Sequence, residues 1–463
     1  MNILKAFFVI TLIVYFNCSL SNGFSISNLP NEDLIRQSND SNFKIWAVLV
    51  AGSNTWSNYR HQADVCHAYQ VLIKHGVHPD NIITMMYDDI AHSKSNPTPG
   101  VIINIPGGVN VYSNITIDYR HSDVNKNNFM NVLKGDAALK AKGKKVLDSG
   151  PNDHVFVYFS DHGGAGVLCF PRNVITSAEL NSTLQWMKAN NRFGAMTLYI
   201  EACESGSMFK NILPQDESIF AVTASRPDES SYAIYFDDER EIYLADEFSI
   251  NWLIDSDTEK SLVNETLEKQ FTIVRSKTKK STPQQFGDHS VRRLSVSQFQ
   301  GDENADHSLF NSVPDTVINS ISSVNAPIES LRRSILKRTD PIEKAALTAH
   351  LGTILAGRDY VNTTIRSIIG KLCQKGYCTN VDDIMETRVP LTNHQAYSEL
   401  ALQFHKSCFS LSTHRHTLSY LYAFANIIED LAVRDKDKLN TISLALKLIC
   451  KRYVGDHRFK AII

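Results

Sequence analysis

Short apolar runs that alternate with helix-compatible stretches constrain the fold of this chain more than any other feature. Five runs in the first half have strand length and are rich in β-branched and aromatic residues: 45–51, 82–87, 154–160, 196–202 and 219–224. Stretches with helical spacing lie between most of them, for example residues 59–75, 128–141 and 177–189. Strands that alternate with helices predict an α/β fold, with a mainly parallel sheet covered by helices on both faces.

Two of these runs end in unusual clusters of polar and small residues. Residues 160–164 read Ser-Asp-His-Gly-Gly, and residues 201–207 read Glu-Ala-Cys-Glu-Ser-Gly-Ser. In a parallel sheet, functional groups gather beyond the carboxyl ends of the strands. Both clusters are therefore expected at the same edge of the sheet.

Cys203 and His162 form the most informative pair in these clusters. A cysteine attacks a carbonyl group as its thiolate and needs a neighbouring base, which His162 can supply. Gly163 lets the backbone approach a substrate closely, and the Gly163 and Cys203 amides can face a developing oxyanion. The alternative interpretation is a strand-ending histidine and a core-filling cysteine. The polar neighbours of Cys203 argue against it: Glu201, Glu204, Ser205 and Ser207.

The second half of the chain has a different character. Residues 301–325 are polar and rich in Asn, Ser and Asp, which is typical of a linker. Residues 326–463 carry apolar side chains at helical spacing and predict an all-helical second domain. This part has 20 Lys and Arg against 13 Asp and Glu, a net charge of +7, which leaves −9 for residues 1–325.

The N-terminus and the sequons predict passage through the secretory pathway. Residues 1–21 combine one early positive charge, a short apolar run and small residues, as a signal peptide does. No other segment approaches the length of a membrane span. Asn-x-Ser/Thr tripeptides mark candidate glycosylation sites at Asn114, Asn181, Asn264 and Asn362.

Several blocks together resemble the legumain (asparaginyl endopeptidase) family in order and spacing. They lie at residues 58–69, 85–89, 96–100, 161–163, 201–207 and 229–232. The resemblance covers essentially the whole chain after the signal peptide. It implies a caspase-like cysteine peptidase domain over residues 42–300, followed by an activation linker over 301–325 and a helical prodomain over 326–463.

By position, the resemblance implies roles for individual residues. Cys203 is the nucleophile, His162 the base and then the acid, and Asn58 orients the imidazole, with Gly163 beside them. The pocket for a substrate Asn is implied to contain Arg60, His61, Glu201, Ser230, Ser231 and Asp246. Protonation of Glu201 or Asp246 would then let a substrate Asp replace Asn. Asp161 stands where relatives can form a succinimide linked to peptide ligation.

The resemblance also implies that the basic helical prodomain covers the active site until acid loosens it and the linker is cut. The sequence departs from relatives here. Residues 336–340 lack the usual self-cleaved Asn, which leaves self-cleavage at Asn325, Asn319 or Asn311, or cleavage by another protease at 332–333 or 337–338. A Cys408–Cys450 disulfide is implied, and Cys373 and Cys378 are candidates for a new short bridge. Ala396 and Ile428 replace the second bridge of relatives.

The expected partners are protein and peptide substrates, the prodomain itself, cystatin-type inhibitors and activating proteases, in an acidic lysosome-like or vacuole-like compartment or after secretion. The net charge of −2 gives no sign of nucleic-acid binding, and no cofactor or metal is implied, because no Cys/His grouping has zinc spacing. Two alternatives remain. A lipid-anchor transamidase usually carries a C-terminal membrane span, and an inactive binding protein would lack Cys203, His162 or Asn58.

Overall fold

The structure is a computed structural model, and it describes residues 43–259, 261–302 and 319–451. The expected signal peptide and Asn311 lie outside these described residues. Among the described residues, no helix is long and apolar enough to cross a membrane.

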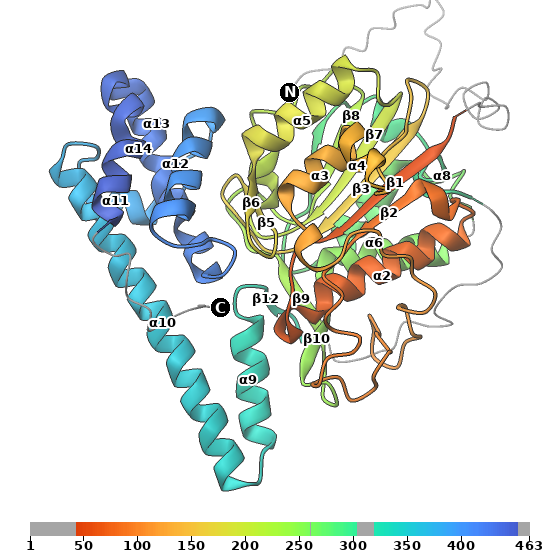
Figure 1. Cartoon of the computed structure of the whole chain (residues 1–463), viewed down its shortest axis with the longest axis horizontal. Coiled ribbons are helices and arrows are strands. Elements are labelled where there is room, and N and C mark those ends of the chain that lie inside the picture. The colour runs from red at the N-terminus through yellow and green to blue at the C-terminus, as the bar shows by residue number, and fades with distance from the viewer. Residues whose placement is uncertain (1–42, 260, 303–318, 452–463) are drawn as a thin grey trace, which may run out of the picture. The chain divides into compact units, whose positions relative to one another are not determined.

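A six-stranded sheet forms the centre of the first half of the chain (Figure 1). Its strand order is β11-β8-β7-β3-β1-β2, and every neighbouring pair is parallel except β11 with β8. The strands are β1 (Ile45–Ala51), β2 (Ile82–Met85), β3 (His154–Ser160), β7 (Ala195–Glu201), β8 (Ile219–Thr223) and β11 (Gln284–Gly287). This sheet confirms the predicted fold class.

Helices cover both faces of the sheet, which explains why the strands are apolar throughout. In β1, Ala47 and Leu49 pack into one core with α2 (Tyr59–Lys74), α6 (Glu247–Thr258) and α7 (Leu267–Lys277). The alternate residues Val48 and Val50 pack into the other core with α3 (Lys126–Leu133) and α5 (Ser177–Ala189). The short helices α4 (Ala137–Ala141) and α8 (Ser297–Gln300) complete this part.

The helix expected over residues 128–141 is interrupted. Helix α3 ends at Leu133, and Gly135 has a positive φ of 66° before Asp136 caps α4. A Cβ atom at Gly135 would lie 2.5 Å from the Leu147 carbonyl oxygen, so only glycine fits this turn.

Two three-stranded sheets lie beside the main sheet. One contains β4 (Gly163–Gly164), β5 (Val167–Cys169) and β6 (Val174–Thr176). The other has the order β10-β9-β12, formed by β9 (Tyr232–Asp237), β10 (Ile242–Asp246) and β12 (Ile321–Ser322). Strand β12 belongs to the expected linker, whose last residues therefore have a defined structure.

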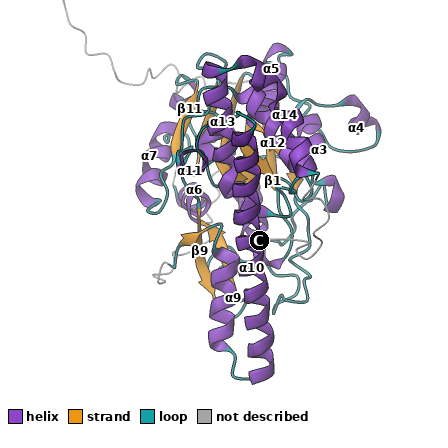
Figure 2. Ribbon diagram, turned by 90° about the vertical axis from the view of Figure 1, so that its left-hand side faces the viewer, coloured by secondary structure: helices purple, strands orange, loops and turns teal. Residues whose placement is uncertain are grey.

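The C-terminal part consists of helices, as predicted. They are α9 (Ala326–Lys337), α10 (Pro341–Gln374), α11 (Val381–Glu386), α12 (His394–Ser407), α13 (Leu421–Arg434) and α14 (Lys436–Cys450), with the 3-10 helix η7 (Arg415–Tyr420) before α13. Helices α9 and α10 run side by side (Figure 2). Disulfides join Cys408 to Cys450 and Cys373 to Cys378. We call the helical part from residue 326 onward the helical module.

The helical module shares a hydrophobic core with the sheet β4-β5-β6. Val167 and Cys169 of β5 pack in one cluster with Tyr397, Leu418 and Leu421 of the module. The Tyr397 hydroxyl donates a hydrogen bond to the Ala165 carbonyl oxygen. The two parts are therefore joined by apolar packing as well as by the chain.

Candidate active site

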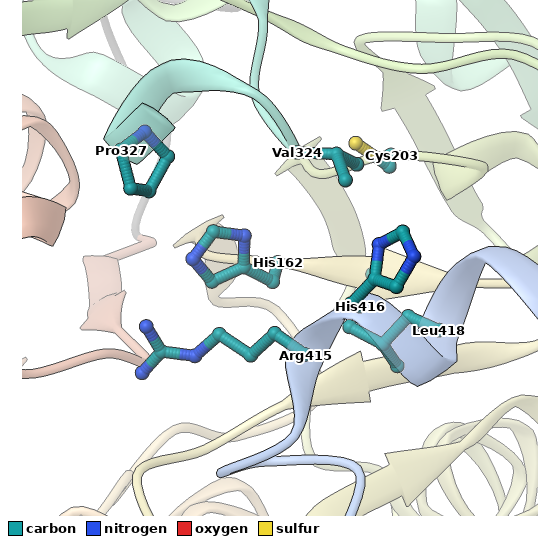
Figure 3. A pocket seen from close by; sticks show the side chains of 8 residues that line it. His162, Cys203, Val324, Pro327, Arg415, His416 and Leu418 are labelled. Carbon is teal, nitrogen blue, oxygen red and sulfur yellow. The ribbon is translucent and has the colours of Figure 1, made fainter. Parts of the chain in front are cut away.

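The two strand-end clusters meet at one edge of the sheet. Strands β3 and β7 are parallel neighbours, and Ser160 is paired with Glu201 at their carboxyl ends. His162 and Cys203 follow these ends and line one pocket together with Gly163 (Figure 3). A Cβ atom at Gly163 would lie 2.5 Å from the Cys203 carbonyl oxygen. This close backbone approach requires glycine at position 163.

Asn58 holds the His162 ring. Its Oδ1 lies 2.7 Å from His162 Nε2, and its Nδ2 donates to the Asn54 carbonyl oxygen at 2.7 Å. Because the amide nitrogen of Asn58 is already a donor, Oδ1 must accept, and Nε2 of the imidazole carries the hydrogen. The Nδ1 lone pair of His162 is then available as a base. Burial lowers the pKa of His162 well below its ordinary value, so the ring is neutral.

The Cys203 thiol is buried and protonated in this state. Its Sγ lies 3.4 Å from Ser230 Oγ and 3.6 Å from Ser231 Oγ, and the Ser231 amide points to it at 3.4 Å. Burial, and secondarily the charge of Glu204, raises the pKa of Cys203 to about 12. Among the described residues, no hydrogen bond joins Cys203 to His162. Cys203 and His162 are therefore both present at this edge of the sheet, but they are not hydrogen-bonded to each other.

Five of the six expected pocket residues are almost completely buried: Arg60, His61, Glu201, Ser231 and Asp246. Arg60 and His61 come from the start of α2, Glu201 from the end of β7 and Asp246 from the end of β10. The sixth residue is Ser230. Its Oγ is hydrogen-bonded to Ser322 Oγ at 2.8 Å and contacts the Cys203 thiol at 3.4 Å.

Fixed hydrogen bonds orient the charged pocket groups. Arg60 Nε donates to Asp246 Oδ1 at 2.8 Å. The amide and hydroxyl of Ser249 both donate to Glu201 Oε2 at 2.9 Å. Among the described residues, three buried atoms of these side chains have no hydrogen-bond partner: Arg60 Nη2, Glu201 Oε1 and Asp246 Oδ2, the last of which lies 3.5 Å from His61 Nε2. They are one unsatisfied donor group and two unsatisfied acceptors.

Asp161 lies next to His162 in the chain, close to the expected catalytic pair. Its Oδ1 is 3.4 Å from His61 Nδ1 and has no hydrogen-bond partner. Burial raises the pKa of Asp161 to about 7, against the opposing charge of Arg415. His61, Asp161 and His162 place ligand atoms within 4.8 Å of one another, a grouping that spacing along the chain did not predict. Nδ1 of His61 is already bonded to Ser53 Oγ at 2.6 Å, so we assign no metal there.

Two segments cover the pair, and the sequence did not reveal either one. Arg415, His416 and Leu418 of η7 line the pocket with His162 and Cys203, and so do Val324 and Pro327 (Figure 3). Gly164 permits the close approach of η7, because a Cβ atom there would lie 3.0 Å from the Leu418 carbonyl oxygen. No spacing signal links Arg415 to residues more than 200 positions earlier, so only the fold identifies it.

Residues 321–327, which we call the covering segment, continue from β12 over the pocket. The Ser323 amide donates to the Ser231 carbonyl oxygen at 2.9 Å. Ser323 Oγ lies 3.2 Å from both Ser231 Oγ and Asp246 Oδ1. Ser323 therefore contacts two of the residues expected to bind a substrate, Ser231 and Asp246, while the Asn325 side chain is held by Arg358 at 2.8 Å.

Comparisons with known proteins identify the family of this chain. A model of the Peptidase C13 family matches residues 45–302. Legumain of Mus musculus is 44% identical over 390 residues, 83% of this chain and 89% of that protein. The hemoglobinase of Schistosoma japonicum is 40% identical over 82% of this chain and 88% of its own length. The vacuolar-processing enzyme delta-isozyme of Arabidopsis thaliana is 41% identical over 63% of this chain and 66% of its own length.

Caspase-1 from Spodoptera frugiperda, a solved structure, is 11% identical with a TM-score of 0.33, covering 56% of this chain and 91% of that one, a likeness too weak to bear on function. The family match spans more than half of the chain, and the relatives are similar along most of it. The chain belongs to the Peptidase C13 family of legumain-type cysteine endopeptidases.

Proposed function

We propose that this endopeptidase cleaves proteins on the carboxyl side of Asn. The observation that carries the proposal is the set of three unpartnered pocket atoms. A carboxamide has one acceptor oxygen and a nitrogen with two hydrogens. Arg60 Nη2 suits the oxygen, and Glu201 Oε1 and Asp246 Oδ2 suit the two hydrogens. An apolar side chain would leave all three atoms buried and unsatisfied, at a cost of about 1 to 3 kcal/mol for each group.

The proposed reaction uses the buried pair once the cover is removed. Nδ1 of His162 takes the proton of Cys203, and Sγ attacks the substrate carbonyl carbon. The Gly163 and Cys203 amides stabilise the oxyanion. His162 then donates its proton to the leaving amine, which breaks the peptide bond and leaves a thioester. Water, deprotonated by His162, hydrolyses the thioester and releases the thiol.

The same site accounts for two further proposed properties. When Glu201 or Asp246 takes up a proton, the pocket gains a donor and loses negative charge, so a substrate Asp replaces Asn in acid. A peptide amine that attacks the thioester in place of water gives ligation, with Asp161 next to the base. Asn-to-Asp selectivity that is equal at every pH would contradict the first of these properties.

We propose that the chain is made as a zymogen in which the covering segment and η7 block the site. Support comes from the contact of Ser323 with Asp246, from Arg415 beside Asp161 and from the high pKa of Cys203. Among the described residues, the ion pairs between the first half and the helical module centre on Glu241, which accepts from Arg338 at 2.5 and 2.8 Å.

The sign of the pH effect follows from the pKa shifts. The Arg338 hydrogen bonds lower the pKa of Glu241, so its contribution holds above the ordinary Glu pKa and is lost as pH falls. Asp161 and Glu204 have the opposite effect. Burial raises their pKa values to about 7 and about 8, so protonation of these two groups in acid favours the closed state, in which they are buried. The proposed opening of the covered site in acid therefore depends on the loss of charge at Glu241 and on the opposite net charges of the first half and the helical module.

We propose that another protease makes the activating cut at residues 337–338. Asp340 is followed by Pro341, and the Asn325 side chain is held away from the pocket by Arg358. Lys337 ends α9, and Arg338 begins an extended connection to α10. Relatives named legumain and vacuolar-processing enzyme support an acidic, lysosome-like or vacuole-like compartment for this chain.

The full-length chain tests these proposals beside its Cys203→Ala variant. Both are incubated in acid, alone and with a trypsin-like protease, then mapped by mass and assayed on matched peptides with Asn, Asp or Ala before the scissile bond. We expect cleavage of the Asn peptide by the wild type only, after a cut near residue 338 that needs the added protease. An activated wild type that cleaves Asn and Ala peptides equally would overturn the specificity.

A further inference from the structure

The loop between β1 and the 3-10 helix η2 (Trp56–Asn58) holds Thr55 in a backbone conformation that side chains rarely adopt. Thr55 has a φ of 75° and a ψ of 154°, a region that is populated almost entirely by glycine. A β-branched residue is poorly suited to it, because its side chain crowds the neighbouring backbone. Such strain persists only where surrounding contacts impose it. We call residues 54–58 the Thr55 turn.

The Thr55 turn supplies the acceptors for the side-chain amide of Asn58, the residue that holds the His162 ring. Asn58 Nδ2 donates to the Asn54 carbonyl oxygen at 2.7 Å and to Thr55 Oγ1 at 3.2 Å. With both amide hydrogens directed into the turn, Asn58 Oδ1 is left to face His162 Nε2 at 2.7 Å. The orientation of the imidazole therefore depends on the conformation of residues 54 and 55.

Asp89 contacts the Thr55 turn from the loop that follows β2. It belongs to the block at residues 85–89, which contributes no residue to the site described above. The Thr55 amide donates to Asp89 Oδ2 at 2.7 Å, and the buried Gln62 side chain donates to Asp89 Oδ1 at 2.8 Å. Gln62 is itself fixed, because its Oε1 accepts from the Asp88 amide at 3.0 Å. The Asp89 carboxylate thus joins the strained turn to α2.

One peptide unit transmits this contact to Asn58. The Thr55 amide and the Asn54 carbonyl group are opposite edges of a single planar peptide unit. Asp89 accepts from one edge, and Asn58 donates to the other. Fixing the amide edge therefore fixes the direction of the carbonyl oxygen and, with it, the Asn58 side chain. A carboxylate suits this task, because it accepts on two oxygens and its charge-assisted hydrogen bonds are stronger than neutral ones.

We propose that Asp89 is a positioning residue of the active site: its carboxylate holds the Asn54–Thr55 peptide unit in its strained conformation, and this unit orients Asn58. The inference rests on the proposed reaction and not on the proposed Asn specificity. Asp89 acts on the base through Asn58, and a misplaced base slows the chemical step. Its loss should therefore lower kcat more than it changes KM.

A cycle of two variants tests whether strain is what Asp89 opposes. With Asp89→Ala we expect kcat on a peptide that the wild type cleaves to fall about thirtyfold, with KM within about twofold. Thr55→Gly removes the hydroxyl but also the strain, so kcat should fall only about threefold. The double variant should lose about tenfold, because a glycine turn needs less support. Single losses that multiply in the double variant would overturn the proposal.

Two milder variants keep the test valid if Asp89→Ala does not fold. Asp89→Asn has one acceptor oxygen for two donors and should lose about fivefold, and this loss should be smaller in the Thr55→Gly background. Asp88→Asn is the matched control, since the Asp88 carboxylate contacts Tyr112 at 2.8 Å and Arg120 at 3.2 Å instead of the turn. All rates are taken per titrated active site, so unfolded protein does not count as a loss. Equal losses in Asp88→Asn and Asp89→Asn would overturn the specific role of Asp89.

Alkylation of Cys203 reports on the catalytic pair without a substrate. Each full-length variant is activated in acid with the trypsin-like protease and treated with iodoacetamide, which reacts with the thiolate that His162 generates. Asp89→Ala should slow labelling of the Cys203 peptide about tenfold, and added Thr55→Gly should restore part of the rate. An unchanged rate in Asp89→Ala would overturn the inference. An unchanged rate in His162→Ala would refute the proposed reaction, whereas a wild type without preference for Asn would refute only the specificity.

Discussion

Ser249 occupies one carboxylate oxygen of Glu201, and the other oxygen has no hydrogen-bond partner among the described residues. The Ser249 amide and hydroxyl both donate to Oε2, and the Tyr158 hydroxyl donates to Ser249 Oγ at 2.7 Å. The motif around residue 201 identified the carboxylate but not its support, since Tyr158 and Ser249 lie 91 positions apart in the chain. At the scale of residues, the sequence pointed to charged groups that the structure brings together and missed those that hold them.

Ser249→Ala tests this support. The backbone donor to Glu201 remains, and one hydroxyl hydrogen bond is lost, which is worth about 1 kcal/mol. We expect kcat/KM for an Asn peptide to fall about fivefold, with a smaller change for an Asp peptide. Steady-state kinetics of both peptides check this, with Ser276→Ala on the exposed face of α7 as the control. An unchanged Asn-to-Asp ratio would mean that Ser249 does not orient Glu201.

At the scale of elements, α5 shows that a sequon can be placed where a glycan does not fit. Asn181 lies on α5, which packs against α12 of the helical module, and its Oδ1 is buried without a hydrogen bond. Asn114, Asn264 and Asn362 are exposed. A glycan on Asn181 would have to displace the atoms that bury this side-chain oxygen.

We therefore expect the folded zymogen to carry glycans at Asn114, Asn264 and Asn362 and none at Asn181. Enzymatic deglycosylation in water enriched in oxygen-18, followed by peptide mapping, converts each glycosylated Asn to a labelled Asp and so reports the occupancy of each site separately. Exposed Asn264 serves as the internal control. A labelled Asp at position 181 in the secreted zymogen would contradict the burial of the Asn181 side-chain oxygen.

Glu241, in the hairpin between β9 and β10, accepts several hydrogen bonds from the end of α9. Glu241 accepts from Ser334 Oγ at 2.8 Å as well as from Arg338, and Lys337 Nζ lies 3.9 Å away. Glu241→Gln should weaken this attachment at neutral pH by about 0.5 to 1 kcal/mol, because the groups are partly exposed and solvent screens the pair. In strong acid the wild-type carboxylate is protonated, so the difference should vanish there.

Thermal unfolding of the full-length chain across pH measures this effect. Glu241→Gln should lower Tm by about 1 to 2 °C at neutral pH and leave it unchanged below about pH 4. Glu239→Gln on the same hairpin is the control, since the Glu239 side chain is 65% exposed. A constant difference at all pH values would exclude an ionic role for Glu241.

Across the whole molecule, the elements that could be predicted are those with apolar periodicity. Five strands of the main sheet and the long C-terminal helices were recognisable, because each buries a regular pattern of side chains. Strand β11 was missed, since Gln284–Gly287 is short, mostly polar and half-buried at the sheet edge. Strand β12 lies in a polar linker and forms only because β9 offers it an edge. The cover over the site depends on such long-range pairing and could not be predicted locally.

The packing of the helical module implies that a cut chain stays assembled. Beyond the proposed cut near residue 338, the contacts that hold the module include the shared core around β5, Tyr397 to the Ala165 carbonyl oxygen and Tyr422 to the Pro227 carbonyl oxygen. None of these contacts includes a carboxylate. Trypsin treatment at neutral pH should therefore cut near residue 338 and yield two fragments that elute together and remain inactive.

Acid should then separate the two fragments, because the module keeps its positive charge while the carboxylates of the first half, which has the opposite net charge, are neutralised. Size-exclusion chromatography with activity measurement across pH follows both steps, and a Lys337→Gln, Arg338→Gln double variant should resist the cut. Fragments that separate at neutral pH would show that the chain connection, rather than the shared core, holds the module in place. Fragments that remain together and inactive in acid would show that removing carboxylate charge is insufficient to expose Cys203.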